Sequence, residues 1–320
     1  MKKLFIIALL SALVACGGGS GSGNVPIENP PPELMGTADL LALGYQDGLA
    51  EIQLGQLALQ RSANPDVRFF AQRMIDDHAL FNNEMRTLAR QRNLVLPATP
   101  TAEQLMLLTQ LQGLSGTAFD QVYMDFNARL HDQDVAQFHL QATYAVDPEI
   151  RLLAAVFYPV LKVHLTRAEE INGVVSPPAY LISAYQDSLL EIQLGQMALQ
   201  NATREDVKAY AQRMITDHTS LSAQIAQTAQ QKGVSLPVNL TASRQADLKD
   251  LSRFSGIKFD QAYMDTSVTA HAKELAVAQR QSAQGTDPEM KALAQASLPL
   301  LAQQYQLAVD LDNTIRASLP

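Results

Sequence analysis

Apolar residues recur every three or four positions along five segments in the first half of the chain, and the same pattern returns in the second half. This spacing places the apolar side chains on one face of an α-helix, and glycine and proline are scarce within the segments. The five predicted helices run from Ala38 to Ala63, Pro65 to Arg92, Ala102 to Gln112, Phe119 to Val146 and Pro148 to Asn172. Four long helices and a short connector predict an antiparallel four-helix bundle.

Three sequence blocks recur with an offset of 140 residues. EIQLGQLALQ at Glu51 returns as EIQLGQMALQ, AQRMIDDH at Ala71 returns as AQRMITDH, and FDQVYMD at Phe119 returns as FDQAYMD. A period of this length is that of a whole domain rather than of a solenoid repeat. The sequence therefore predicts an all-α protein of two tandem bundles of ferritin-like type, each with a short extra helix between its second and third long helices.

The predicted domains are residues 34–172 and 179–320, joined by a linker at 173–178. The chain begins MKKLFIIALLSALVACGGGS, whose apolar run from Leu4 to Ala15 is 12 residues long. Spanning a bilayer takes roughly 20 residues, so this run predicts an export signal over residues 1–15.

Leu13-Val14-Ala15-Cys16 resembles the bacterial lipobox, in which the signal is removed and the cysteine carries lipid. Cys16 is the single cysteine of the chain, so disulfides are excluded. Residues 16–33 are rich in glycine, serine and proline and predict a flexible tether. Together with Gly17 after the cysteine, this pattern predicts a protein anchored by lipid to the outer membrane and facing the periplasm. An ordinary secretory signal with an incidental cysteine is the alternative.

Acidic residues outnumber basic ones. Loss of Lys2 and Lys3 with the signal leaves 22 basic and 32 acidic residues, a net charge of 22 − 32 = −10. An acidic surface repels phosphate backbones, which argues against nucleic-acid binding. The sequence identifies no protein partner, substrate or reaction.

Each long helix of the first half carries one ionisable residue in the middle of its apolar face when the residues are placed at 100° intervals. These residues are Glu51, His78, His131 and His164. Glu51 and His78 lie 13 and 14 residues from the turn at Asn64, roughly 20 Å at 1.5 Å per residue. His131 and His164 lie at a similar depth from the turn between their own helices, so all four side chains are expected to meet.

An unpaired carboxylate in an apolar core costs several kcal/mol, so these groups must satisfy one another or hold something. Glu51 and three imidazoles form a plausible ligand set for a Zn, Fe, Mn or Cu ion. Asp47 and Asp134 fall on the same faces, where either can add a ligand or orient a histidine. The alternative is a metal-free network of carboxylate–imidazole hydrogen bonds that fixes the bundle.

The second half keeps only part of this set. Its counterparts are Glu191, His218 and His271, with Asp187 and Glu274 in the places of Asp47 and Asp134. Gln304 stands where the first half has His164. Because glutamine is a poor ligand for transition metals, the second centre is predicted to be a degenerate copy.

The segments EIQLGQLAL, FAQRMIDDH, FDQVYMD, DPEI and YPVLKVHL resemble, in order and spacing, the bacterial family named domain of unknown function 4142. The resemblance covers nearly all of both halves and implies a ferritin-like fold, but no activity. Di-iron proteins of that fold use Glu-x-x-His motifs, whereas Ile75 and Leu161 stand three residues before His78 and His164. A site for one metal ion is therefore favoured over a di-iron site.

These features together predict an envelope lipoprotein with a buried Glu/His cluster in each bundle, which binds a transition metal most strongly in the first bundle. The alternative is a metal-free structural, interaction or stress-protection module.

Overall fold

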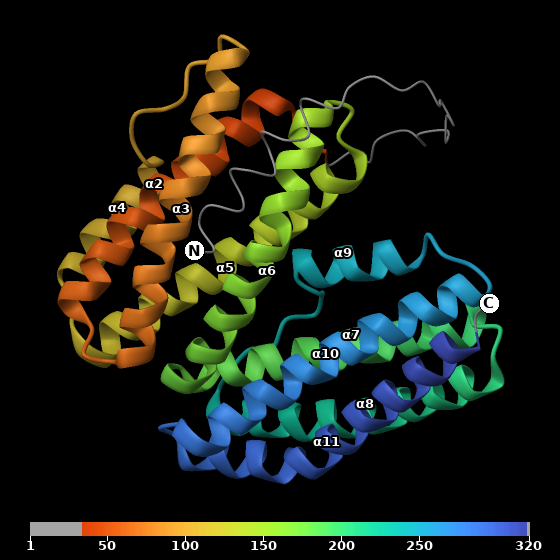
Figure 1. Ribbon diagram of the computed structural model, residues 1–320. Coiled ribbons are helices and arrows are strands. Elements are labelled where there is room, and N and C mark those ends of the chain that lie inside the picture. The colour runs from red at the N-terminus through yellow and green to blue at the C-terminus, as the bar shows by residue number, and fades with distance from the viewer. Residues whose placement is uncertain (1–33, 319–320) are drawn as a thin grey trace, which may run out of the picture.

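The computed structural model describes residues 34–318, which form ten helices and no strands. The predicted signal, Cys16 and the tether lie outside this range. The first bundle comprises α2 (Thr37–Arg61), α3 (Pro65–Gln91), α4 (Ala102–Gln112), α5 (Gly116–Tyr144) and α6 (Pro148–Val175). The second comprises α7 (Pro177–Asn201), α8 (Glu205–Lys232), α9 (Ala242–Leu251), α10 (Ile257–Gln284) and α11 (Pro288–Ala317). Figure 1 shows these two sets as separate groups of helices and confirms the predicted all-α architecture.

The sequence signals for helix starts correspond to real caps. The Asn64 side chain accepts a hydrogen bond from the backbone N–H of Asp66 at 2.9 Å, and that of Asp147 accepts one from Glu149 at 2.9 Å. Each cap satisfies a backbone donor that the first turn of a helix leaves free. These two turns fix the pairs α2–α3 and α5–α6, which pack side by side.

Two helix boundaries differ from the prediction by three residues. Helix α5 begins at Gly116 rather than Phe119, because Gly116 adopts a φ of +58° that allows a sharp turn directly into the helix. Helix α6 continues to Val175, through half of the predicted linker. Val174 and Val175 are buried, so packing stabilises a helix that the glycine before them disfavours. Only Ser176 separates α6 from α7.

The core of each bundle is divided into two apolar clusters. In the first bundle, one cluster gathers around Phe81 and Phe157, whose rings stack at 3.9 Å. The other gathers around Phe70 and Tyr123 at the opposite end. Each long helix contributes residues to both clusters and carries one of the predicted ionisable residues between them, so a polar layer separates two apolar halves.

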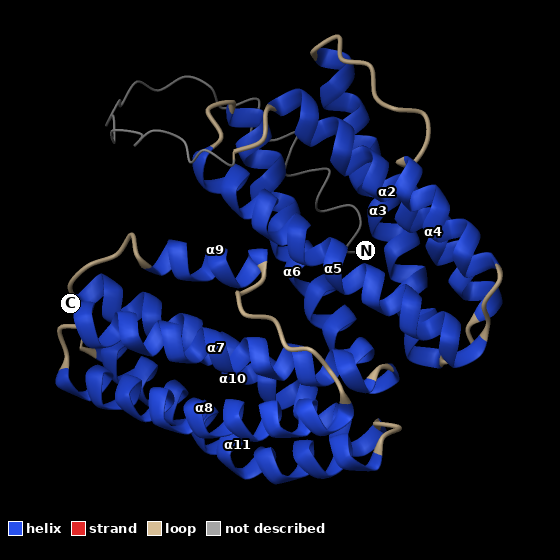
Figure 2. Cartoon of the chain, turned by 180° about the vertical axis from the view of Figure 1, so that it is seen from behind, coloured by secondary structure: helices blue, strands red, loops and turns tan. Residues whose placement is uncertain are grey.

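The two bundles pack against each other through α6 and α5 of the first and α7, α9 and α10 of the second. Figure 2 shows α9 lying beside α5 and α6. Four charged side chains meet at this boundary, which we name the interface ion cluster: Glu169, Asp187, Arg244 and Lys273. Arg244 Nη2 lies 3.1 Å from Glu169 Oε1, and Lys273 Nζ lies 2.7 Å from Glu169 Oε2. The cluster thus joins the bundles with charges that balance.

None of the helices in residues 34–318 combines the length and the apolar character that crossing a membrane requires.

Candidate metal centre

The four ionisable residues predicted to meet in the first bundle do lie in one buried layer. Glu51 is 1% exposed, His78 3%, His131 0% and His164 1%. Each comes from a different long helix, because each helix turns one such position into the space between the two apolar clusters.

The distances within this layer are those of interacting groups. Glu51 Oε2 lies 2.8 Å from His78 Nε2, and Glu51 Oε1 lies 3.2 Å from His131 Nε2. The centroids of the three imidazole rings are 5.2 to 5.7 Å apart. One nitrogen from each ring falls within 4.8 Å of one nitrogen from the other two, so the three histidines form a group that can hold a metal ion.

Hydrogen bonds outside the layer fix the tautomers of two histidines. His131 Nδ1 lies 2.9 Å from the carbonyl oxygen of Asn127, which can only accept, so Nδ1 carries the proton. His164 Nε2 donates in the same way to Asp77 Oδ2 at 3.0 Å. The other nitrogen of each ring therefore presents a lone pair to the interior, as ligating histidines do.

Several buried atoms of this layer lack a hydrogen-bond partner among residues 34–318. They are both carboxylate oxygens of Glu51, Nε2 of His78 and His131, and Nδ1 of His164. The Glu51 oxygens lie close to the two Nε2 atoms, but the angles do not suit hydrogen bonds. Lone pairs held this close in an apolar core repel unless a proton or a cation lies among them.

The protonation state of the three imidazoles favours ligation at neutral pH. Burial lowers the pKa of His78, of His131 and of His164 to about 4, so all three imidazoles are neutral. Burial also raises the pKa of Glu51 to about 7. Neutral imidazoles bind metals without first losing a proton.

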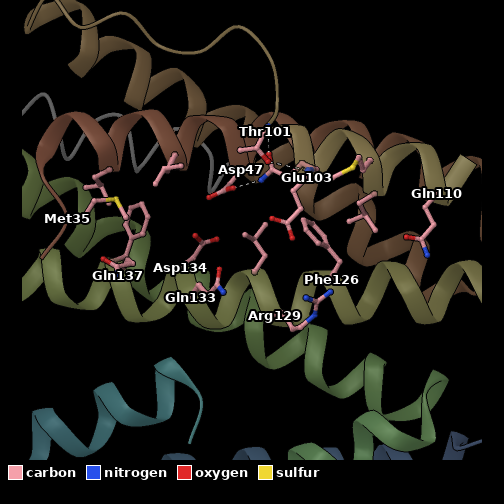
Figure 3. A pocket seen from close by; sticks show the side chains of 18 residues that line it. Met35, Asp47, Thr101, Glu103, Gln110, Phe126, Arg129, Gln133, Asp134 and Gln137 are labelled. Carbon is pink, nitrogen blue, oxygen red and sulfur yellow. Dashed lines mark hydrogen bonds between the residues drawn. The ribbon is translucent and has the colours of Figure 1, made fainter. Parts of the chain in front are cut away.

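Asp47 and Asp134 lie beside this layer, in an open pocket of about 600 Å³ (Figure 3). A carboxylate oxygen of Asp134 lies within 4.8 Å of ligand atoms of Glu51 and His131. Asp47 accepts a hydrogen bond from Gln104 Nε2. Burial raises the pKa of Asp47 to about 7 and, together with the charges of Asp47 and Glu51, raises the pKa of Asp134. Both aspartates line the pocket, and Asp134 is also within reach of an ion held by Glu51 and His131.

The second bundle arranges its retained residues differently. Glu191, His218 and His271 are at most 1% exposed and again bring one ligand atom each within 4.8 Å. His271 Nδ1 lies 3.4 Å from Glu191 Oε1, while its Nε2 faces the sulfur of Met214 at 3.2 Å. Burial opposes protonation of His271, but the charge of Glu191 outweighs it and raises the pKa to about 9. This pKa favours a protonated His271 beside Glu191 at neutral pH, although neither His271 Nδ1 nor a Glu191 oxygen forms a hydrogen bond within residues 34–318.

The other predicted residues of the second centre also differ from their counterparts in the first. Gln304 Nε2 donates to Asp217 Oδ2 at 3.2 Å, repeating the contact of His164 with Asp77 without an imidazole. Glu274 is buried beside Glu191 and His271, and burial raises its pKa to about 8. Asp187 orients no histidine, since it belongs to the interface ion cluster.

Sequence reasoning missed the outer contacts of the first centre. Asp77 immediately precedes His78, and Asn127 lies one helical turn before His131. A spacing of four residues in a helix brings the Asn127 carbonyl oxygen near the His131 ring, so this contact could have been predicted from the sequence. The contact between Asp77 and His164 joins helices α3 and α6, and no local pattern reveals it.

The sequence profile of a family described as Domain of unknown function (DUF4142) matches residues 27–171 and 174–311. The chain belongs to this family. It contains two tandem copies of the DUF4142 domain, one for each bundle, as the sequence resemblance predicted. Comparisons with curated proteins and with solved structures returned no match. The DUF4142 description itself assigns no function.

Proposed function

We propose that the first bundle binds one transition-metal ion through His78, His131 and His164, with Glu51 beside them. The observation that carries this proposal is the convergence of buried lone pairs that have no hydrogen-bond partner among residues 34–318. A cation removes their mutual repulsion, and outer hydrogen bonds already hold two of the rings in the ligating tautomer. Imidazole and carboxylate ligands suit Zn, Fe, Mn or Cu.

The second bundle is proposed to remain metal-free. The ion pair of His271 with Glu191 supplies internally the positive charge that the first centre takes from a metal. Protonated His271 has no lone pair to offer, and Gln304 removes the third imidazole. In this copy the buried network fixes the bundle, as in the alternative hypothesis for the whole chain.

The setting of this metal site is proposed to be the bacterial cell envelope. The support is in the sequence, where the apolar run of residues 4–15 precedes Cys16 and a glycine- and serine-rich segment. A lipid on Cys16 would tether both bundles to the outer membrane on its periplasmic side. Labelling with a fatty-acid analogue tests this, because the label should disappear in Cys16→Ser.

Metal loading tests the first proposal directly. The chain from residue 17 onward, which retains every described residue, is dialysed with Zn²⁺, Mn²⁺, Fe²⁺ or Cu²⁺ and analysed by native mass spectrometry. We expect one ion per chain with at least one of these metals. His131→Ala should abolish binding, whereas the matched variant His271→Ala should leave it unchanged. Equal metal content in His131→Ala and the unaltered chain would refute the site.

His164→Gln separates ligation from stability, because the second bundle already carries glutamine at this position. Gln304 donates to Asp217 as His164 donates to Asp77, so the substitution should preserve that contact. We expect the stability of the metal-free variant to change by less than about 1 kcal/mol. Its metal affinity should fall at least about tenfold, as it does when even an outer contact of a metal site is lost. Titration with a chromogenic chelator measures the affinity, and unchanged affinity would exclude His164 as a ligand.

A further inference from the structure

The pocket beside Asp47 in the first bundle has an equivalent in the second bundle. The equivalent pocket contains Asp187, Arg244 and Lys273, each 140 residues after a residue of the first pocket. One hydrogen bond near the aspartate recurs in both bundles. Gln46 Nε2 donates to the carbonyl oxygen of Thr99 at 3.1 Å, and the corresponding Gln186 donates to that of Asn239 at 2.8 Å.

In the second bundle two cationic side chains of the chain itself enter this space and reduce it to a pocket of about 280 Å³. Arg244 Nε donates to Asp187 Oδ1 at 2.9 Å, and Lys273 Nζ lies 3.1 Å from the same oxygen. Each charged group lies at the end of an aliphatic side chain. Glu169 of the first bundle pairs with both of them. The carboxylate of Asp187 is thus fully neutralised.

In the first bundle the same carboxylate has no such partner. Gln104 replaces Arg244, and Gln133 replaces Lys273. Asp134 also lines the pocket. Within residues 34–318 it forms neither a hydrogen bond nor an ion pair. Behind it lies Glu51, 1% exposed and with both oxygens unpartnered within the same range. Within residues 34–318, the carboxyl groups at the base of this pocket therefore lack the arginine and lysine that lie beside Asp187.

The walls of the pocket suit an aliphatic ligand. Apolar side chains line much of it: Met35, Leu40, Leu43, Met106, Leu107, Phe126, Leu130 and Phe138. Figure 3 shows Asp47 and Asp134 directed into the space between α2 and α5, with Phe126 near them. Arg129 also lines the pocket, but its guanidinium pairs with Asp125 at 3.0 Å and its side chain is 69% exposed. An acidic base and apolar walls favour a cation that carries a hydrocarbon chain.

We propose that this pocket binds a small organic cation, an ammonium or guanidinium group on a short aliphatic chain, with Asp47 and Asp134 as its counter-ions. The ligand occupies the volume that the stems and charged groups of Arg244 and Lys273 fill in the second bundle. Its binding does not require the metal ion, because Asp47 belongs to neither group of side chains in the first bundle that could hold one, and Asp134 can pair with the organic cation when no metal is bound.

Agmatine, which carries both a guanidinium and an ammonium group, is the probe for this site. Isothermal titration at low ionic strength into the chelator-treated chain from residue 17 onward should show saturable binding at one site. Pentanol, which has a similar apolar chain and no charge, should bind at least tenfold more weakly. Asp47→Asn and Asp134→Asn should each lower the affinity for agmatine at least tenfold.

Gln104→Arg is the decisive variant, because it installs the residue that fills the equivalent pocket of the second bundle. Its guanidinium should pair with Asp47 and abolish agmatine binding, while circular dichroism remains that of the unaltered chain. His164→Gln removes a proposed metal ligand but no residue of the pocket, so it should bind agmatine normally even if no metal ever binds. Absence of saturable binding, or equal binding by Gln104→Arg, would overturn the proposal, as would binding of Mg²⁺ in place of agmatine.

Discussion

Replacing Arg244 with methionine should destabilise the chain by about 3 kcal/mol. Arg244 is 4% exposed and pairs with Glu169 of the first bundle and Asp187 of the second. Removing it leaves two buried carboxylates with Lys273 alone to balance them. Breaking a buried ion pair by deleting one partner costs about 3 to 5 kcal/mol, because the remaining charge stays desolvated. Equilibrium urea denaturation measures the loss.

Arg253→Met is the matched control. Arg253 also lies where the bundles meet, since its guanidinium lies over the Tyr144 ring at 5.2 Å. Its ion pair with Asp250 is 2.8 Å long, but its side chain is 44% exposed. Exposed ion pairs contribute less than about 1 kcal/mol, so this variant should remain close to the unaltered chain. If both variants lose the same stability, the interface ion cluster does not hold the bundles together.

The helical period was sufficient to predict both the fold class and the level of the first centre. Rotation at 100° per residue fixes which side of a helix a residue occupies, and counting residues from a turn fixes its depth. The contact between Glu51 and His78 was predicted correctly because the side and the depth of a helical residue depend little on the rest of the fold. Neither quantity fixes a side-chain rotamer, so the contact of His164 with Asp77 could not be predicted.

Asp47 and Asp187 show where such reasoning fails. They occupy the same position in two copies of one helix, and both were expected to support a histidine cluster. Their environments differ because the residue that lies 57 positions after each aspartate is Gln104 in the first copy and Arg244 in the second. That residue belongs to the short connecting helix, whose packing depends on tertiary structure rather than on the apolar period of the long helices.

The same divergence separates the two centres. In the first bundle, buried carboxylates have no fixed cation, the imidazoles are neutral and a pocket opens beside them. In the second bundle, Arg244 and Lys273 enter the equivalent pocket, and the charge of Glu191 raises the pKa of His271 to about 9. The two copies therefore balance their buried carboxylates differently, because Arg244 and Lys273 lie beside the aspartate of the second copy, where the first has Gln104 and Gln133.

His271→Leu should destabilise the second bundle by about 3 kcal/mol, because it leaves Glu191, 0% exposed, without its charge partner. Replacing both residues by leucine should restore most of that stability, since a buried ion pair and an apolar pair of similar volume are often equivalent. Urea denaturation of both single variants and the double variant gives the coupling between the two side chains. A double variant as unstable as His271→Leu would show that the layer needs its polar groups.

The pH dependence provides a second test of the same pair. The folded pKa of His271 is about 9, above its usual 6.5, so the stability it contributes is fully present below pH 6.5 and is lost as the pH rises through 9. Glu274, with a folded pKa of about 8, acts in the same direction. The unaltered chain should therefore lose stability between pH 7 and 9.5, and the double leucine variant should lose less. Both chains are measured with chelator present, so that a metal in the first bundle contributes to neither slope. The difference between the two slopes then belongs to the second bundle, and equal slopes would show that the His271–Glu191 pair does not cause the pH dependence.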